Sequence, residues 1–280
     1  MPPALPRLSD AQRATVLGWF PGAELVADHS WGLVDTAVLQ VRHTGGDAVV
    51  KASPGGSHHL DREITAHEQM LAPLAGSVPR LLYAARGQSV LATEFVPGTL
   101  VLGTAAEGDP EVYRQAGSLL ARLHAQPARA DWGYQAAMDA KALAWLDGDS
   151  GIGVAETAAL RRIVQAHRPD AVTLVPTHGD WQPRNWLVHE GHVRVIDFGR
   201  ADWRPAESDL ARLAVQQFVG RPDLETAFLD GYGQDPRKAA SWPMMQVREA
   251  IGTAAWAHQV GDTAFEAQGK RMIAEVLTLW

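Results

Sequence analysis

The sequence predicts an α+β fold with two lobes, a small β-rich lobe followed by a larger, mainly helical one. Short runs rich in Val and Leu gather in the first third of the chain around one helical segment, as is typical of a strand-rich lobe. Pro97-Gly98 then interrupts the pattern, and segments of helical period follow. We therefore expect an N-terminal lobe over residues 1–97 and a C-terminal helical lobe over residues 98–280.

Local signals predict the elements of the first lobe. Ser9 is a typical N-cap residue and predicts a short helix that ends near Leu17. Four residues share one face of a second helix, predicted over residues 58–71: Leu60, Ile64, His67 and Leu71. Strands are predicted over residues 31–43, 48–52, 80–85 and 90–96.

The second lobe begins with a strong helix signal. Asp109 is a capping residue, Pro110 suits the first helical position, and Glu111 complements the positive end of the helix dipole. Further helices are predicted over residues 136–146, 154–166, 205–219, 223–232, 237–260 and 264–279. Two short strands over residues 186–189 and 192–196, joined by Glu190-Gly191, interrupt this helical series.

Composition excludes several classes of protein. The net charge is -7, whereas proteins that bind phosphate backbones are usually basic, so we expect no nucleic-acid partner. Cysteine is absent, which excludes disulfides, zinc sites with thiolate ligands and a cysteine nucleophile. The first residues lack the apolar core of a signal peptide, and no window is apolar enough to span a membrane. We therefore expect a cytoplasmic protein with no membrane contact.

Candidate catalytic residues cluster in two neighbouring segments, 178–185 and 195–199. The first has the sequence His-Gly-Asp-Trp-Gln-Pro-Arg-Asn, and the second has the sequence Val-Ile-Asp-Phe-Gly. Phosphoryl transfer requires a carboxylate that orients the attacking hydroxyl and oxygen ligands for Mg²⁺. Asp180 and Asn185, five positions apart in a loop that leads into a hairpin, can place a base beside a metal ligand. Asp197, after the next strand, can then reach the same metal.

Each of these segments alone is a weak signal. An Asp followed five positions later by Asn occurs by chance, and Asp197-Phe198-Gly199 also suits an ordinary turn. Their order, with one predicted hairpin between them, favours the catalytic interpretation.

The two segments resemble the His-Gly-Asp-x4-Asn and Ile-Asp-Phe/Trp-Gly blocks of the aminoglycoside phosphotransferase family, which includes choline-kinase and homoserine-kinase relatives on the protein-kinase-like fold. Three more segments are similar to family elements: Leu-Ala-Arg-Leu-His at 120–124, Glu-Phe-Val-Pro-Gly at 94–98 and Ser-Asp-Leu-Ala at 208–211. The resemblance covers roughly residues 25–215, and the remaining C-terminal residues match only as generic helices.

The resemblance implies roles for the principal site residues. Asp180 becomes the catalytic base, and Asn185 and Asp197 become the Mg²⁺ ligands. Lys51, at the end of a Val-Val-Lys strand, would contact the α- and β-phosphates, although a solvated lysine on an edge strand is the alternative. Glu63 is the candidate for the helix acid that orients Lys51, with Glu68 as the alternative.

The nucleotide, ATP or GTP, is expected against the segment that connects the lobes. Adenine would bond backbone groups of Glu94 and Val96. A glycine-rich loop is absent before Lys51, and the segment that begins at Ser30 occupies its place. Three residues are predicted to supply apolar walls: Val49, Leu187 and Ile196.

Other positions of these segments have supporting or open roles. His178 is expected to bond backbone around the loop, and Asp209 to brace the loop or cap a helix. Arg184 stands where many family members have Gly, and it either meets the γ-phosphate or the substrate or faces solvent. Asp202 and Glu207 are expected near the acceptor. Five more acids are candidates for the acceptor pocket: Asp230, Asp235, Glu249, Asp262 and Glu266.

The resemblance implies an ATP-dependent phosphotransferase that uses Mg²⁺ and acts on a hydroxyl of a small molecule. We expect a cationic antibiotic, either an aminoglycoside or a basic peptide antibiotic, and hence a role in antibiotic resistance. A metabolic kinase for choline, a sugar or an amino alcohol is the first alternative, and a non-catalytic nucleotide-binding module is the second. The short span after Gly199 leaves no room for an activation loop, which argues against a protein kinase. We expect a monomer or a homodimer.

Overall fold

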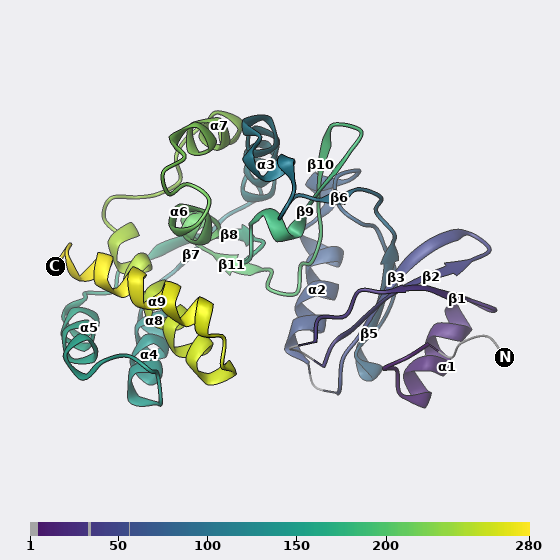
Figure 1. Cartoon of the computed structure of the whole chain (residues 1–280), viewed down its shortest axis with the longest axis horizontal. Coiled ribbons are helices and arrows are strands. Elements are labelled where there is room, and N and C mark those ends of the chain that lie inside the picture. The colour runs from purple at the N-terminus through teal and green to yellow at the C-terminus, as the bar shows by residue number, and fades with distance from the viewer. Residues whose placement is uncertain (1–4, 33–34, 56) are drawn as a thin grey trace. The chain divides into compact units, whose positions relative to one another are not determined.

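The structure is a computed structural model that describes residues 5–32, 35–55 and 57–280. Its α-helices are α1 (Asp10–Trp19), α2 (His58–Gln69), α3 (Pro110–His124), α4 (Tyr134–Asp147), α5 (Val154–Ala166), α6 (Ala211–Val215), α7 (Pro222–Tyr232), α8 (Trp242–Val260) and α9 (Thr263–Leu277). Its strands are β1 (Glu24–Asp28), β2 (Ala37–His43), β3 (Gly46–Ala52), β4 (Leu81–Ala85), β5 (Val90–Glu94), β6 (Thr99–Leu100), β7 (Arg129–Asp131), β8 (Val172–Thr177), β9 (Trp186–His189), β10 (His192–Val195) and β11 (Asp202–Arg204). The predicted α+β class is confirmed (Figure 1).

The chain forms two compact units, each made of three segments. The first unit comprises residues 1–124, 178–202 and 223–233, and the second comprises residues 125–177, 203–222 and 234–280. The lobe boundary predicted between residues 97 and 98 lies inside the first unit, and it stays a prediction.

An antiparallel five-stranded sheet in the order β1-β2-β3-β5-β4 dominates the first unit. Alternation along β3 directs Ala48, Val50 and Ala52 into a core with α1, and the opposite face carries Val49 and Lys51. Leu91 of β5, opposite Lys51 in register, packs against α2. The helices α1 and α2 therefore cover opposite faces of the sheet (Figure 1).

The rest of the first unit contains α3, α7 and a small sheet in the order β10-β9-β6. The helices α3 and α7 cross with their backbones in close contact. A Cβ atom at Gly117 would overlap the carbonyl oxygen of Phe228, and one at Gly231 would overlap that of Arg114. Only glycine fits at these two positions, so this crossing depends on both residues.

The second unit is built on a helical core formed by α4, α5, α8 and α9. Its side chains are mostly aliphatic, among them Leu160, Val247, Ile251 and Ile273. A buried polar cluster joins α4 to α8, because Asp139 accepts hydrogen bonds from Arg248 and pairs with His167 at 2.7 Å. The strands of the third sheet, in the order β11-β8-β7, lie at the edge of this unit, with Asp202 assigned to the first unit.

Two helix predictions were wrong in extent. The helix expected over residues 237–260 begins only at Trp242, because Pro243 has a fixed φ and no N–H and therefore occupies the first turn. The helix expected over residues 205–219 is a 3-10 turn at Ala206–Leu210 followed by the short α6. The chain leaves that helix at Gln216, and the turn buries Phe218.

Strand predictions were least accurate where strands are short. The strand expected over residues 31–43 begins at Ala37, and β1 precedes it. Four further strands were not expected: β6, β7, β8 and β11. Among the described residues, no helix has the length and apolar character needed to cross a membrane.

Candidate active site

The alternation of β3 directs Lys51 toward α2, where it meets a buried acid. The ammonium nitrogen of Lys51 lies 2.8 Å and 3.0 Å from the two carboxylate oxygens of Glu63, which is 4% exposed. Glu68, the alternative partner, lies on the exposed side of α2 and binds Arg86 at 2.8 Å. The structure therefore pairs Lys51 with Glu63.

The segment 197–199 is held to this pair and to α2 by three contacts. Asp197 Oδ1 lies 3.0 Å from Lys51 Nζ, and the Phe198 N–H donates to the Glu63 carboxylate. His59, at the start of α2, bonds the carbonyl oxygen of Gly199 at 3.0 Å. The segment after β10 is thus fixed to β3 through Asp197 and to α2 through Phe198 and Gly199.

The backbone of Asp197 has φ of 67°, in the left-handed region that non-glycine residues seldom adopt. Aspartate tolerates this region better than most residues, and backbone strain of this kind is concentrated at functional sites. The conformation leaves the Asp197 side chain 52% exposed. Its carboxylate is therefore accessible to a ligand while one oxygen contacts Lys51.

The three charged groups shift one another's pKa values. Burial favours the neutral form of Lys51, but the charges of Asp197 and Glu63 outweigh this effect and raise the pKa of Lys51. Burial raises the pKa of Glu63, although Lys51 opposes the change. The charge of Lys51 lowers the pKa of Asp197. Lys51 and Asp197 are therefore ionised at neutral pH.

The loop that begins at His178 is built around a fully buried imidazole. His178 Nδ1 accepts from the Asp180 N–H at 3.2 Å, so Nε2 carries the hydrogen and donates to the carbonyl oxygen of Ile196 at 3.1 Å. Gly179, between them, has φ of 78°, which explains the glycine at this position. His178 thus links this loop to the residue that precedes Asp197.

The carboxylate of Asp180 is buried and receives three side-chain hydrogen bonds. Gln182 Nε2 donates to Oδ1 at 2.5 Å, and Arg184 Nη2 donates to Oδ2 at 2.5 Å. Asn185 Nδ2 donates to the same Oδ2 at 3.1 Å and to the backbone oxygen of Asp180 at 2.8 Å. These donors fix the orientation of the carboxylate.

Two oxygen atoms near this loop fit a divalent cation. Because the Asn185 amide bonds Asp180 through its nitrogen, its Oδ1 points away from Asp180. Asn185 also accepts from the Ile196 N–H at 3.0 Å, which brings it next to Asp197. An amide oxygen and a carboxylate are hard ligands of the kind that Mg²⁺ takes together with phosphates and water.

The residues expected around adenine all belong to the first unit, but they lie on different elements. Val49 shares a face of β3 with Lys51, and Leu187 and Ile196 are half-buried. The Glu94 N–H is already used, because it donates to the Arg80 carbonyl at 2.9 Å, and the Glu94 carboxylate binds the Arg80 guanidinium. Val96 follows the end of β5. These nucleotide contacts stay predictions.

Ser30 lies between β1 and β2, and its hydroxyl accepts from the Val38 N–H at 2.9 Å. This bond fixes the start of the segment that precedes Ala37. Residues 33–34 of this segment lie outside the described residues.

The acids expected near the acceptor are mostly engaged by the chain itself. Asp202 lies 3.5 Å from Arg62 of α2. Glu207 and Asp209 belong to the second unit and are buried, and Glu207 accepts from the Ser241 hydroxyl at 2.5 Å. Their roles toward an acceptor or the loop stay predictions. Four of the C-terminal acids have partners in the second unit: Asp235 with Arg237, Glu249 with Arg212, Asp262 with the Phe265 N–H, and Glu266 with Lys270 and His258.

Sequence reasoning missed two residues of the site. Gln182 lies inside the segment 178–185, and its bond to Asp180 was not anticipated. His59 was expected only as a residue of a loop or helix start, but it bonds Gly199. The position of Gln182 two residues after Asp180 was a usable signal, whereas nothing local connects His59 to Gly199.

Comparison with protein families matches residues 30–242 to the phosphotransferase enzyme family. A search of curated proteins gives no match. Solved structures resemble the whole chain. A macrolide 2'-phosphotransferase from Brachybacterium faecium is 20% identical, with a TM-score of 0.61 over 92% of this chain and 95% of that one.

Two further structures are similar at lower identity. A thermostable mutant of an aminoglycoside phosphotransferase, in complex with ADP and hygromycin B, is 13% identical, with a TM-score of 0.69 over 95% of this chain and 97% of that one. A choline kinase from Streptococcus pneumoniae is 14% identical, with a TM-score of 0.68 over 96% and 98%. These structures share the predicted protein-kinase-like fold. Since the family match spans most of the sequence, the chain belongs to the phosphotransferase enzyme family.

Proposed function

We propose that this phosphotransferase moves the γ-phosphate of ATP to a hydroxyl group of a small molecule, with Mg²⁺ as the metal. The observation that carries the proposal is the carboxylate of Asp180, which is oriented by Gln182, Arg184 and Asn185. The Lys51–Glu63–Asp197 network supports it by supplying a cation and a metal ligand in the same unit. Positioning and charge stabilisation account for most of phosphoryl-transfer catalysis.

In this proposal Asp180 orients the acceptor hydroxyl and takes its proton as the oxygen bonds to the γ-phosphorus. The bond from that phosphorus to the β,γ-bridging oxygen breaks, and ADP leaves. Lys51 holds the α- and β-phosphates, and Glu63 keeps its ammonium in place. Asn185 and Asp197 would hold Mg²⁺, which neutralises charge on the phosphates.

We propose a hydroxylated antibiotic as the acceptor, since two of the similar structures are a macrolide 2'-phosphotransferase and an aminoglycoside phosphotransferase in complex with hygromycin B. The engagement of Asp235, Glu249 and Glu266 by basic side chains favours an acceptor with few positive charges over a polycation. The Arg184 cation beside Asp180 supports the same choice. A metabolic acceptor such as choline is the alternative that the test below distinguishes.

The test is acceptor-dependent ADP release with Mg²⁺ and either ATP or GTP. The panel contains macrolides, aminoglycosides, choline, other amino alcohols and sugars. We expect turnover with one antibiotic class and a loss of about 10²–10⁴-fold in Asp180→Asn. Binding of a non-hydrolysable ATP analogue should be unchanged in that variant, which controls for folding. Unchanged turnover in Asp180→Asn would refute the role of this residue, and nucleotide binding without turnover on any acceptor would favour a non-catalytic module.

Two further measurements separate the parts of the proposal. Asp197→Asn should shift the Mg²⁺ titration of activity to higher concentration, because it replaces a charged oxygen ligand with a neutral one. For a polycationic acceptor, the acceptor KM should rise steeply with salt as the Debye length falls from about 10 Å at 0.1 M to about 3 Å at 1 M. We expect a shallow salt dependence instead.

A further inference from the structure

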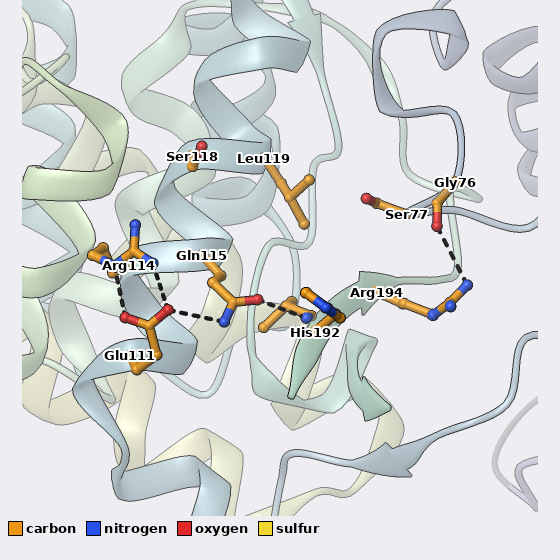
Figure 2. Close-up of a pocket in the computed structure, with 10 residues that line it drawn as sticks. Gly76, Ser77, Glu111, Arg114, Gln115, Ser118, Leu119, His192 and Arg194 are labelled. Carbon is orange, nitrogen blue, oxygen red and sulfur yellow. Dashed lines mark hydrogen bonds and ion pairs between the residues drawn. The ribbon is translucent and has the colours of Figure 1, made fainter. Parts of the chain in front are cut away.

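A cavity of about 540 Å³ opens in the first unit, away from the residues of the candidate active site. Three elements line it: α3, the strand β10, and the loop that carries Gly76 and Ser77 before β4. Figure 2 shows the lining side chains between these elements. The volume lies within the range of about 300–1,000 Å³ that is typical of small-molecule sites.

The carboxylate and amide oxygens of the lining side chains, those of Glu111 and Gln115, already accept hydrogen bonds. Both oxygens of Glu111 bind Arg114, at 2.5 Å and 2.7 Å, and Gln115 donates to Glu111 at 3.0 Å. These donors lower the pKa of Glu111 to about 2, so the acid stays ionised and its charge is balanced by Arg114. The Gln115 oxygen accepts from the Val193 N–H at 2.9 Å.

The same bonds make the wall of the cavity rigid. Besides its bonds to Glu111 and Val193, Gln115 donates to the carbonyl oxygen of Gly191 at 3.0 Å. One amide thus joins α3 to the residue before β10 and to Val193 within it. Figure 2 shows Gln115 between α3 and β10. The cavity wall is therefore fixed before any ligand binds, which reduces the cost of ordering it.

Some hydrogen-bond donors of the lining side chains remain available to a ligand. Arg194 has one long bond, from Nη1 to the Gly76 carbonyl at 3.3 Å, and its buried Nε has no hydrogen-bond partner in the described part of the chain. It forms no ion pair with any carboxylate among the described residues, so its positive charge is not balanced locally. The Ser77 and Ser118 hydroxyls and the His192 ring also line the cavity.

A cavity whose carboxylate and amide oxygens are occupied, and whose guanidinium is not balanced, suits a ligand that is rich in acceptors and negatively charged. Arginine binds phosphate and carboxylate groups through paired N–H donors. We propose that this cavity binds a small organic oxyanion, a phosphate or a carboxylate, with Arg194 as its charge partner. The volume leaves room for the organic part of such a molecule beside its charged group.

A ligand in this cavity would affect the candidate active site through β10. Arg194 precedes Asp197 by three residues, and the Val195 N–H donates to the Ser77 carbonyl at 2.8 Å. A ligand held between Arg194 and Ser77 would therefore contact the strand and the loop that this bond joins.

Calorimetric titration of the full-length chain tests the proposal. Three probes share one carbon skeleton: glycerol 3-phosphate, glycerate and neutral glycerol. A saturating non-hydrolysable ATP analogue with Mg²⁺ blocks the nucleotide site, and ionic strength is held constant. We expect one equivalent of at least one anion to bind with a Kd below about 10 mM, and no binding of glycerol.

Arg194→Gln should weaken anion binding by about tenfold or more, because a charged hydrogen bond is lost. Ser118→Tyr, which fills the cavity without touching Arg194's charge, should abolish it. Arg42→Gln is the matched control, since Arg42 is an exposed arginine of the same unit that pairs with Asp47. Circular dichroism verifies that each variant is folded.

The proposal is overturned if neither anion saturates up to about 10 mM, if glycerol binds equally, or if folded Arg194→Gln and Ser118→Tyr bind the anion as the wild type does. Binding that Arg194→Gln leaves unchanged would assign the anion to another site, such as the nucleotide site. The test therefore remains decisive even if the proposed phosphotransfer from ATP fails.

Discussion

Arg184 Nη2 lies 2.5 Å from Oδ2 of Asp180, so the chain places its own cation on the acid proposed as the catalytic base. The Asp180 side chain is 4% exposed, whereas the Arg184 side chain is 39% exposed. Arg184 therefore has room to move, and Asp180 does not. An acceptor hydroxyl that approaches Asp180 must share its carboxylate with this arginine or displace it.

Replacing Arg184 with Met should lower kcat by about tenfold, because a buried carboxylate loses a short charged hydrogen bond and is less well oriented. The KM for ATP should change little, since Lys51, the proposed partner of the nucleotide phosphates, is untouched. Steady-state kinetics with the best acceptor measure both quantities. Arg80→Met, which removes an exposed arginine paired with Glu94, is the control. An unchanged kcat in the Arg184 variant would show that Gln182 and Asn185 suffice to orient the base.

The contributions of Lys51 and Glu63 to the free energy of unfolding should depend on each other. Lys51→Met leaves the buried Glu63 carboxylate without its cation and should lower the free energy of unfolding by about 3 kcal/mol. Adding Glu63→Gln to that variant should recover about 1 kcal/mol or more, because the unpaired acid is removed. Urea unfolding of the wild type, both single variants and the double variant provides the cycle. Strictly additive changes would contradict the coupling.

His67 should make stability depend on pH. Burial lowers the pKa of His67 to about 4, and its Nε2 is buried with no partner in the described chain. Between a pKa near 6.5 in the unfolded chain and about 4 in the folded one, the unfolded chain binds more protons. The free energy of unfolding therefore falls as the pH falls through this window.

His67→Met removes this contribution without breaking a hydrogen bond. The decrease in unfolding free energy between pH 7 and pH 5 should be smaller in the variant by about 2 kcal/mol. Urea unfolding at the two pH values measures the difference. His29→Gln is a control, because this exposed ring has a partner in Gln40 at 3.2 Å. Equal pH dependence in wild type and His67→Met would contradict the prediction.

The crossing of α3 and α7 should not tolerate a methyl group. Gly231→Ala places a Cβ atom on the carbonyl oxygen of Arg114, so the helices must separate, at a cost of about 1–3 kcal/mol or more. Gly18→Ala in α1 meets nothing within 4 Å and should be neutral or slightly stabilising. Thermal unfolding of the two variants compares them directly. A Tm for Gly231→Ala at or above that of the wild type would argue against this close crossing.

The parts of the site that sequence predicted are those with a local pattern. Asp180, Asn185 and Asp197 stand at fixed spacings around one hairpin, and the structure joins their loops through the Ile196 backbone. Lys51 and Glu63 belong to adjacent elements, a strand and the helix after it, so their contact depends on short-range geometry. Contacts between residues that are far apart in the sequence have no such local pattern. Glu207 was expected to face an acceptor, but its bond to Ser241 depends on the packing of the second unit.

Strand prediction failed where pairing rather than composition makes the strand. β8 contains Pro176, which argues against a strand in sequence, and yet it pairs with β7. β6 has only two residues, and its pairing with β9 depends on a segment more than 80 positions away. Such strands are fixed by the surrounding fold and not by their own residues.

The division of the chain has a consequence for how the protein is made. Neither unit is a continuous stretch, because residues 178–202 and 223–233 complete the unit that begins at the N-terminus. During synthesis, a growing chain that has passed residue 124 still lacks Asp180, Asn185 and Asp197, and it also lacks the α7 partner of Gly117. The first unit therefore cannot finish folding on the ribosome until residue 233 has emerged. By then, residues 125–177 and 203–222 of the second unit have already been translated, so these segments must wait unfolded or partly folded until residues 234–280 follow.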